Sequence, residues 1–474
     1  MVSLRQIITT INNSENGFYE CWNIMSSIKE GTSTAEQILS FQTKLIDCLV
    51  PIEQLYSKVA HEKSEVISRI RELKSDCFKR RLRTLSKYRN ILVELISFGR
   101  SFGDAFVWLF YSREKQLLIK HLKITKPKHL PPGVGGIGEF EFIKKIKIFR
   151  NNMVIYHGIT NMLRFGDVSF INLENLKVIA IGELKTRKIS NKEIEVSVYF
   201  TGEKDAVEDT FSLSKRLSMR KIDLPDRLKQ KLIRQLKETS NSIYKTTSNQ
   251  LNGLDLGLHN YFKELADLAK NCKTSKFNYK KAGEGLLLAG IRARKTKFHS
   301  KFIGKGNYFF LDELYNLPNE VKKITKEQSD ENIIKLSTIH PHREVMPGAL
   351  PLFWWPIDID IIRKIYFNEL LIFTIYNLVY FMEKLRSIGL NVKWNENKKD
   401  IIITKKINKR ESRIQNTGYF IRMIQDYLVS EDSVVELIKK FLSSLEKKKF
   451  KAGTKIQMQI LHEVRSDSNL QNKI

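Results

Sequence analysis

Hydrophobic residues recur at helical spacing from residue 33 to about residue 120. Apolar side chains return every three or four positions, which gathers them along one side of an α-helix. Ser33 and Glu36 have the spacing of a capping box, so we expect a helix to begin there, and Pro51 indicates where it breaks. Residues 91–111 are apolar on nearly all sides, which predicts a buried helix. The pattern predicts a helical arm or bundle over residues 1–125.

A different pattern begins after the proline and glycine cluster at 126–138. Residues 139–149 have helical spacing. Beyond them, short runs rich in β-branched and aromatic residues are separated by turn residues, which is typical of strands. The predicted strands are 153–158, 161–171, 177–184 and 193–200. We therefore expect a small sheet preceded by a helix.

From about residue 209 the spacing becomes helical again. The run at 283–294 (GEGLLLAGIRAR) predicts one more buried strand. The longest apolar run, Leu370–Met382, contains Asn377 and is too short to cross a bilayer, so we interpret it as a buried helix.

These elements predict three domains. Residues 1–125 form the helical arm, which offers a surface for a homodimer or a partner subunit. Residues 126–310 contain the sheet and a helical insertion. Residues 311–474 form a mainly helical C-terminal domain with a small hairpin. The expected fold class is mixed α/β and rich in helix.

Charge adds a candidate partner. The chain carries 81 Lys and Arg against 52 Asp and Glu, a net charge of +29. Such an excess favours a polyanion, because each cation that neutralises a phosphate releases a condensed counterion. The chain is also rich in Lys, Asn and Ile, a composition that an A+T-rich genome produces whatever the function. Charge alone therefore favours nucleic-acid binding without establishing it.

Cysteine usage and the N-terminal residues indicate the compartment. Four scattered cysteines show neither zinc-finger spacing nor a disulfide framework: Cys21, Cys48, Cys77 and Cys272. The first residues lack the basic head and apolar stretch of a signal peptide. We expect a cytoplasmic protein with no membrane partner.

The segment RFGDVSFINLENLKVIAIGELKT (164–186) carries the strongest chemical signal. Asp167 lies on one predicted strand, and Glu183 and Lys185 end the next. Because side chains alternate along a strand, Glu183 and Lys185 must point the same way, and Asp167 joins them if the strands are neighbours. Two carboxylates beside an ammonium are costly without a cation between the acids. With bound Mg²⁺ such a group suits phosphodiester hydrolysis.

GD followed by GELKT on the next strand resembles the PD-(D/E)xK superfamily of restriction-endonuclease-like nucleases. The resemblance covers residues 130–300 and is specific only in 166–185. It implies an αβββαβ core between the two flanking domains. It also implies that Asp167, Glu183 and the backbone carbonyl of Leu184 hold Mg²⁺ or Mn²⁺.

The same resemblance assigns two further roles. Lys185 would orient or deprotonate the attacking water and stabilise the charged transition state. Glu139, with Glu141 as the fallback, occupies the position of an acid on the first core helix. If Glu139 contributes, two metals become available to the reaction, and if it does not, one suffices.

The E-x-K pattern is weak alone, because the chain contains five copies of it. Only the copy at Glu183 ends an apolar strand that follows an Asp-bearing strand. The alternative is an exposed Glu–Lys pair on a solvated edge strand. Two features depart from the family: Gly166 replaces the usual Pro, and about 100 residues separate Lys185 from the last predicted strand near Gly285. This gap implies either a large helical insertion or a misplaced last strand.

Other motifs carry weaker signals. Gly133, Gly135 and Gly138 spell GxGxxG without a preceding strand, so we interpret them as a turn into the helix rather than a nucleotide site. His340 and His342 lack a third ligand nearby, which favours a structural loop over a metal site.

Aromatic and basic clusters remain. The run Phe353–Pro356 (FWWP) is interpreted as core or as a domain interface rather than as a base-stacking surface. The candidate contacts to phosphate are Arg292, Arg294, Lys295 and Lys297. Aromatic residues are interleaved with this basic segment, namely Phe298, Phe302 and Tyr308. An ordinary solvated face is an equally favoured interpretation of this basic segment.

The sequence therefore predicts a Mg²⁺-dependent nuclease, with DNA as a more favoured substrate than RNA. Resemblance to restriction and repair nucleases implies a bacterial role in phage defence or DNA processing. The alternative is a non-catalytic nucleic-acid-binding or scaffold protein with a degenerate nuclease-like core. Retention of the polar positions favours the enzyme.

Overall fold

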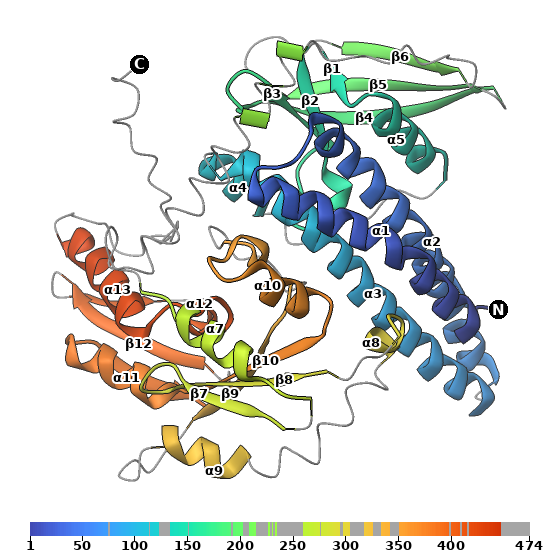
Figure 1. Cartoon of the computed structure of the whole chain (residues 1–474). Coiled ribbons are helices and arrows are strands. Elements are labelled where there is room, and N and C mark those ends of the chain that lie inside the picture. Colours follow the sequence, from blue (N-terminus) through green and yellow to red (C-terminus); the bar gives the residue numbers. More distant parts are fainter. Residues whose placement is uncertain are drawn as a thin grey trace. The chain divides into compact units, whose positions relative to one another are not determined.

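The computed structural model covers residues 1–474 (Figure 1). It describes residues 1–73, 76–112, 114–122, 133–149, 151–190, 193–201, 208–214, 226–227, 230, 233–234, 259–274, 276–293, 297–303, 317–325, 333–341, 350–397, 400–407, 410–414 and 417–446.

The chain divides into two compact units. The first contains Met1–Ile243, Lys297–Gly304 and Pro341–Trp354, and the second contains Tyr244–Thr296, Lys305–His340 and Trp355–Ile474. This division differs from the three predicted domains, because the N-terminal helices and the sheet that follows belong to one unit.

Three long helices begin the first unit: α1 (Leu4–Glu30), α2 (Ala35–Leu73) and α3 (Asp76–Tyr111). They pack side by side (Figure 1). The predicted bundle is confirmed, although α1 was not predicted. The capping box of α2 is formed by Thr34 and Gln37, one residue after the predicted pair, with each side chain accepting the other's backbone amide.

The predicted break at Pro51 is wrong, because α2 continues through it. Proline removes one backbone hydrogen bond, and packing of α2 against α1 and α3 on both sides of Pro51 offsets that loss. The burial of α3 is as predicted, since its residues from Phe98 to Tyr111 are all buried. Phe298 and Phe302, beside the short helix α8 (Ser300–Ile303), pack against Phe98.

Two short helices, α4 (Lys115–Leu122) and α5 (Gly133–Lys145), lead to a sheet whose six described strands follow sequence order and pair antiparallel. The strands are β1 (Ile148–Phe149), β2 (Asn152–Tyr156), β3 (Val168–Asn172), β4 (Val178–Ser190), β5 (Glu193–Thr201) and β6 (Glu208–Ser214). The 3₁₀ turn η1 (His157–Ile159) follows β2.

The sheet confirms the predicted strands and the helix before them, with two corrections. Residues 161–167 form no strand, and β6 occupies part of the region predicted to become helical from about residue 209. The resemblance also implied a helix and then a last strand after the one bearing E-x-K. Instead, β5 begins three residues after β4 ends and pairs with it antiparallel.

The two faces of this sheet are covered differently. Tyr156, Val168 and Gly182 are cross-strand partners and share one face, together with Leu184 and Thr186. Helix α5 covers that face at β4 and β5 (Figure 1), and a Cβ on Gly138 would lie 2.3 Å from Cγ2 of Thr186. The opposite face carries Ser169, which hydrogen-bonds Tyr111 at the end of α3.

The second unit contains a sheet whose four described strands have the order β7 (Asn278–Lys281), β8 (Leu286–Arg292), β10 (Leu370–Asn377) and β9 (Ile334–Ile339). Strand β8 is the predicted strand at 283–294, but it lies in this sheet and in this unit. The expectation that it completes the sheet containing Glu183 is therefore wrong. Its strand partners are β7 and β10.

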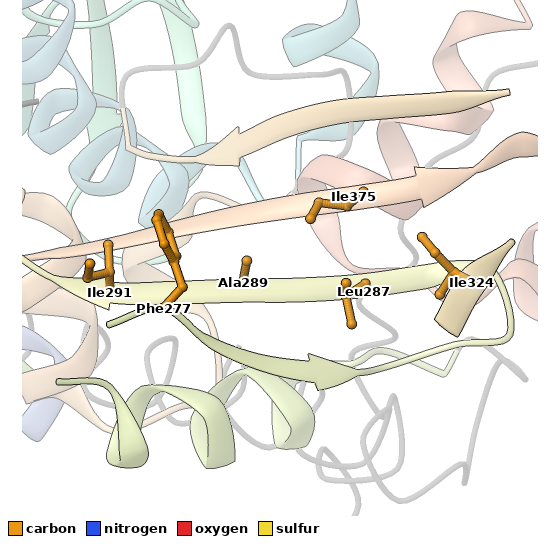
Figure 2. Packing of buried hydrophobic residues seen from close by; sticks show 6 residues of the cluster. All are labelled: Phe277, Leu287, Ala289, Ile291, Ile324 and Ile375. Atoms are coloured by element: carbon orange, nitrogen blue, oxygen red, sulfur yellow. The ribbon is translucent and has the colours of Figure 1, made fainter. Parts of the chain in front are cut away.

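Strand β8 is apolar along its length because both of its faces are buried. One face packs in the cluster that Figure 2 shows, formed by Phe277, Leu287, Ala289, Ile291, Ile324 and Ile375. On the other face, a Cβ on Gly290 would lie 2.6 Å from Sγ of Cys272, which follows α7 (Phe262–Asn271).

The predicted helix at Leu370–Met382 is also wrong. Its first part is β10 and its second part is α11 (Leu378–Ser387). The change falls at Asn377, whose side chain accepts the amide of Val379 and caps α11. Alternating branched and aromatic residues before Asn377 favour the strand.

The C-terminal region contains more sheet than predicted. The expected small hairpin is confirmed as β11 (Asn391–Asn395) and β12 (Asp400–Ile407), which pair antiparallel, and β13 (Arg410–Ile414) adds a third strand to it. The remaining described elements are α9 (Leu317–Val321), η4 (Lys322–Ile324), η5 (Leu352–Trp354), α10 (Ile359–Tyr366), α12 (Gly418–Tyr427) and α13 (Glu431–Glu446). Within the described ranges, no helix combines the length and apolar character needed to cross a membrane.

Candidate active site

Asp167 lies beside the middle of β4. It directly precedes β3, and its backbone amide donates to the carbonyl of Gly182 at 2.8 Å. Its carboxylate Oδ2 accepts the backbone amide of Leu184 at 2.7 Å, and the side chain is buried. These two hydrogen bonds bracket Glu183, so the chain fold brings Asp167 to the E-x-K segment.

Glu183 and Lys185 point to the same face of β4. Lys185 Nζ lies 3.1 Å from Glu183 Oε2, and the two side chains are 64% and 48% exposed. This confirms the alternation argument from the sequence. The face is the one opposite α5, so solvent reaches both charged groups.

The backbone of Leu184 also faces Asp167. In an extended strand, the amide and carbonyl of one residue point to the same neighbouring strand. Because the Leu184 amide reaches the carboxylate of Asp167, its carbonyl points to the same side of β4. Leu184's own side chain is buried on the face covered by α5.

Glu139 does not join this group, which corrects the expectation from the resemblance. It is buried on α5, and its Oε2 accepts the hydroxyl proton of Tyr156 at 2.6 Å. Tyr156 lies on the face opposite Glu183 and Lys185, because its cross-strand partners are Val168 and then Gly182. Glu141, the fallback, forms an ion pair with Lys145 on the same helix.

Buried polar groups hold the segment that leads to Asp167. Asp104 on α3 accepts the hydroxyl of Thr160 and the backbone amides of Asn161 and Met162. Burial nevertheless raises the pKa of Asp104, because desolvation exceeds the effect of these donors. Gly103, one residue earlier, permits the approach: a Cβ there would meet the carbonyl oxygen of Ile159 at 1.9 Å.

Two histidines continue this support. Nδ1 of His121 accepts the backbone amides of Arg164 and Phe165 at 3.2 and 3.1 Å, which requires an unprotonated Nδ1. Burial lowers the pKa of His121 to about 4, so the ring remains neutral at pH 7. His157 contacts the carbonyl of Gly166 through Nδ1 at 3.1 Å and Ser169 through Nε2 at 2.5 Å. A carbonyl only accepts, so Nδ1 carries the proton.

The donor set suits a hard divalent cation. Asp167, Glu183 and the Leu184 carbonyl offer only oxygen, the donor that Mg²⁺ and Mn²⁺ prefer. Among the residues that the structure describes, no three His, Cys, Asp or Glu side chains form a metal-binding group. A cation here would therefore be held by two carboxylates and a carbonyl with water, which is a usual arrangement for Mg²⁺. Without Glu139, the fit is to one metal.

The basic candidates are not brought together by the described structure. Arg292 ends β8 in the second unit and is half-buried, whereas Lys297 is exposed in the first unit. Arg294 and Lys295 lie outside the described residues. Phe298 and Phe302 are buried against Phe98, so they are not available for stacking on bases. Phosphate binding by the basic segment stays a prediction.

The other motifs are structural where the structure describes them. The three glycines of the GxGxxG match lie within α5, which begins at Gly133, rather than in a preceding turn. Trp354 is buried and donates its ring N–H to the carbonyl of Ala105, which confirms the core interpretation of the aromatic run. His342 lies outside the described residues.

Sequence reasoning missed the groups that support Asp167. Asp104 sits in an apolar helix, and His121 is a single histidine in a short helix, so no local pattern marks them. It also missed Phe165 and Tyr199, which are exposed beside the candidate site. Tyr199 had a usable signal, because strand alternation places it outward opposite Glu183.

Comparison with protein-family models, curated proteins and solved structures gave no match for this chain. Functional inference therefore depends on the site geometry.

Proposed function

We propose that the protein is a divalent-metal-dependent nuclease whose catalytic residues are Asp167, Glu183 and Lys185. One observation carries the proposal. The Asp167 carboxylate accepts the amide of Leu184, the residue between Glu183 and Lys185. The carboxylate of Asp167, from a separate segment of the chain, is thereby brought to the part of β4 that carries Glu183 and Lys185.

Each group has a distinct role in this proposal. Asp167, Glu183 and the Leu184 carbonyl would hold the cation, which supplies charge stabilisation at the phosphate and a more acidic water. The Lys185 ammonium lies on the solvent side, where it can orient a water and stabilise the negative charge that develops on the phosphate oxygens. Exposure of this face gives a polymeric substrate access to both charged side chains.

The proposal depends on these side chains and not on a complete family core. Strand β5 follows β4 directly, and β8 belongs to another sheet. This chain shares three features with the core that the resemblance implies. They are the helix, the antiparallel strands after it, and the position of Asp167 beside the E-x-K strand. Nucleic acid is favoured as the substrate by the net charge of +29, with DNA ahead of RNA as in the resemblance.

A cleavage assay tests the proposal. Circular and linear DNA would be incubated with the full chain in Mg²⁺, in Mn²⁺ and in EDTA. We expect metal-dependent cleavage that Asp167→Asn and Glu183→Gln abolish. Lys185→Ala should reduce the rate by about 10²–10³-fold, the usual loss when one transition-state donor is removed.

Arg187→Ala is the matched control for Lys185→Ala. Arg187 is exposed, lies on β4 two residues after Lys185, and carries the same charge on the same face. A specific role for Lys185 predicts a rate loss below about tenfold in Arg187→Ala, since only general attraction for phosphate is weakened there. Binding without cleavage in the wild-type protein, or equal losses in the two variants, contradicts the proposed function.

A further inference from the structure

Two aromatic residues near the candidate active site in the chain fold are exposed to solvent. Within the described part of the chain, the exposed large hydrophobic side chains include only two aromatic residues, Phe165 and Tyr199. Their side chains are 43% and 41% exposed. Most other aromatic side chains in the described residues are buried or half-buried, so exposure of these two calls for a physical reason.

Tyr199 lies directly across from Glu183. The two residues are antiparallel partners on β5 and β4, so they share the open face of the sheet. Directly opposite residues have Cβ atoms about 5 Å apart. The next partner pair on that face is Lys185 and Ser197, so the aromatic ring adjoins both charged groups.

Phe165 lies on the segment before β3, which adjoins β4 on the side opposite β5, and its ring packs against the ring of His121 at 6.3 Å between centroids. It is two residues before Asp167, and its amide donates to His121. Gly166, which has a φ of +70°, brings the chain against β4: a Cβ there would lie 2.3 Å from Cγ2 of Ile181. Phe165 and Tyr199 therefore belong to the two segments of chain that adjoin β4 on either side of Glu183.

We infer that the substrate of this site is single-stranded nucleic acid, with bases stacked on Phe165 and Tyr199. This inference rests on the proposed function for the meaning of the site. Base faces in a duplex are covered by their neighbours, whereas unpaired bases present a face to an aromatic ring. Exposed aromatic rings beside a cationic surface are the combination by which proteins bind single strands.

Charge on the same face suits the backbone of such a strand. Lys185 and Arg187 follow one another along the open face of β4, at i and i+2, and both are exposed. The two residues are about 6–7 Å apart along the strand. Successive phosphates in an extended single strand have a separation of the same order. Bases stacked on the rings would place a phosphate near Lys185.

Equilibrium binding in EDTA tests this inference without any catalysis. Fluorescence anisotropy would be measured with labelled dT20, rU20 and a 20-base-pair duplex at one fixed salt concentration. We expect the full chain to bind the single strands at least tenfold more tightly than the duplex. The tighter of dT20 and rU20 then identifies the polymer.

Ring removal and ring conservation separate stacking from other effects. Phe165→Ala and Tyr199→Ala should each weaken single-strand binding by about 5- to 150-fold, the range for one stacked base. Tyr199→Phe and Phe165→Tyr should stay within about twofold of wild type. Leu336→Ala, which removes an exposed apolar side chain of the second unit, is the control.

The outcomes distinguish this inference from the proposed function. Tighter duplex binding, or alanine variants that bind single strands as Leu336→Ala does, overturns it even if Mg²⁺-dependent cleavage is found. Ring-dependent single-strand binding without cleavage in Mg²⁺ supports the binding surface and rejects the nuclease.

Discussion

Polar side chains are buried in one half of the first sheet and exposed to solvent in the other half. Around β2 and β3, polar side chains are buried and bonded to protein: Gln42 pairs with the backbone of β2, accepting from Tyr156 and donating to Val154. Around β4 and β5, the face opposite α5 leaves Glu183 and Lys185 in solvent. Both halves belong to one continuous antiparallel sheet.

This difference separates stability from activity. A buried polar group that finds its partner within the protein contributes to the fold and is costly to disturb. An exposed ion pair contributes little to the fold, so its residues are available for a ligand. Substitutions in the first region should therefore unfold the protein, and substitutions in the second should inactivate it without unfolding it.

The largest expected effect on stability comes from a buried ion pair beneath the sheet. Arg100 donates to Glu53 at 2.7 Å, and both side chains are almost fully buried. Glu53→Gln removes the negative charge from this buried pair, so we expect a loss of about 3–5 kcal/mol in the free energy of unfolding. Urea denaturation followed by circular dichroism measures it.

Glu183→Gln is the matched control, because it makes the same change in an exposed pair. We expect it to alter the free energy of unfolding by less than about 1 kcal/mol. Equal destabilisation by the two substitutions would contradict the contrast between buried and exposed polar groups.

The next effect is a pH dependence of stability. Burial lowers the pKa of His121 to about 4 from the ordinary value of 6.5, so the unfolded chain binds a proton between these values that the folded protein does not. Stability due to neutral His121 is complete above pH 6.5 and is lost as the pH falls toward 4. A shift of this size corresponds to a loss on the order of 3 kcal/mol.

Comparison with His121→Asn isolates this contribution. The Asn carbonyl can accept the amides of Arg164 and Phe165 that Nδ1 accepts, and it does not titrate. Thermal unfolding between pH 7 and pH 4 should show a smaller decline in stability for the variant than for the wild type. Parallel declines would mean that His121 does not carry the effect.

The smallest expected effect concerns Glu139. Glu139→Gln weakens the hydrogen bond from Tyr156, which should cost about 1 kcal/mol of unfolding free energy. Because Glu139 faces away from Glu183 and Lys185, we expect cleavage rates within about twofold of wild type. A rate loss comparable to that of Asp167→Asn would place Glu139 in the active site and refute its assignment to the α5 face.

Short-range sequence patterns predicted the elements that depend only on neighbouring residues. The branched run before Glu183 marks β4, and alternation fixed the shared face of Glu183 and Lys185. The face reached by Glu139 could not be predicted, because it depends on how α5 packs through Gly138 on Thr186. The partner strands of β8 and the division at Asn377 are likewise set by tertiary pairing and capping.

For Asp167, the sequence predicted the site but not the contacts that position the side chain there. Its residue type and its distance from Glu183 suggested a shared site, but the hydrogen bond that brings it there requires a bend at Gly166 and buried support from Asp104 and His121. The support from Asp104 and His121 has no sequence motif, because both residues act through contacts across more than 40 positions of the chain.

Titration with Mn²⁺ followed by calorimetry tests the central claim most directly. If Asp167 and Glu183 hold the cation, the full chain should bind one Mn²⁺, Asp167→Asn and Glu183→Gln should each abolish binding, and Glu139→Gln should leave it unchanged. Binding that survives both substitutions, or is lost in Glu139→Gln, would contradict a metal site at this position on β4.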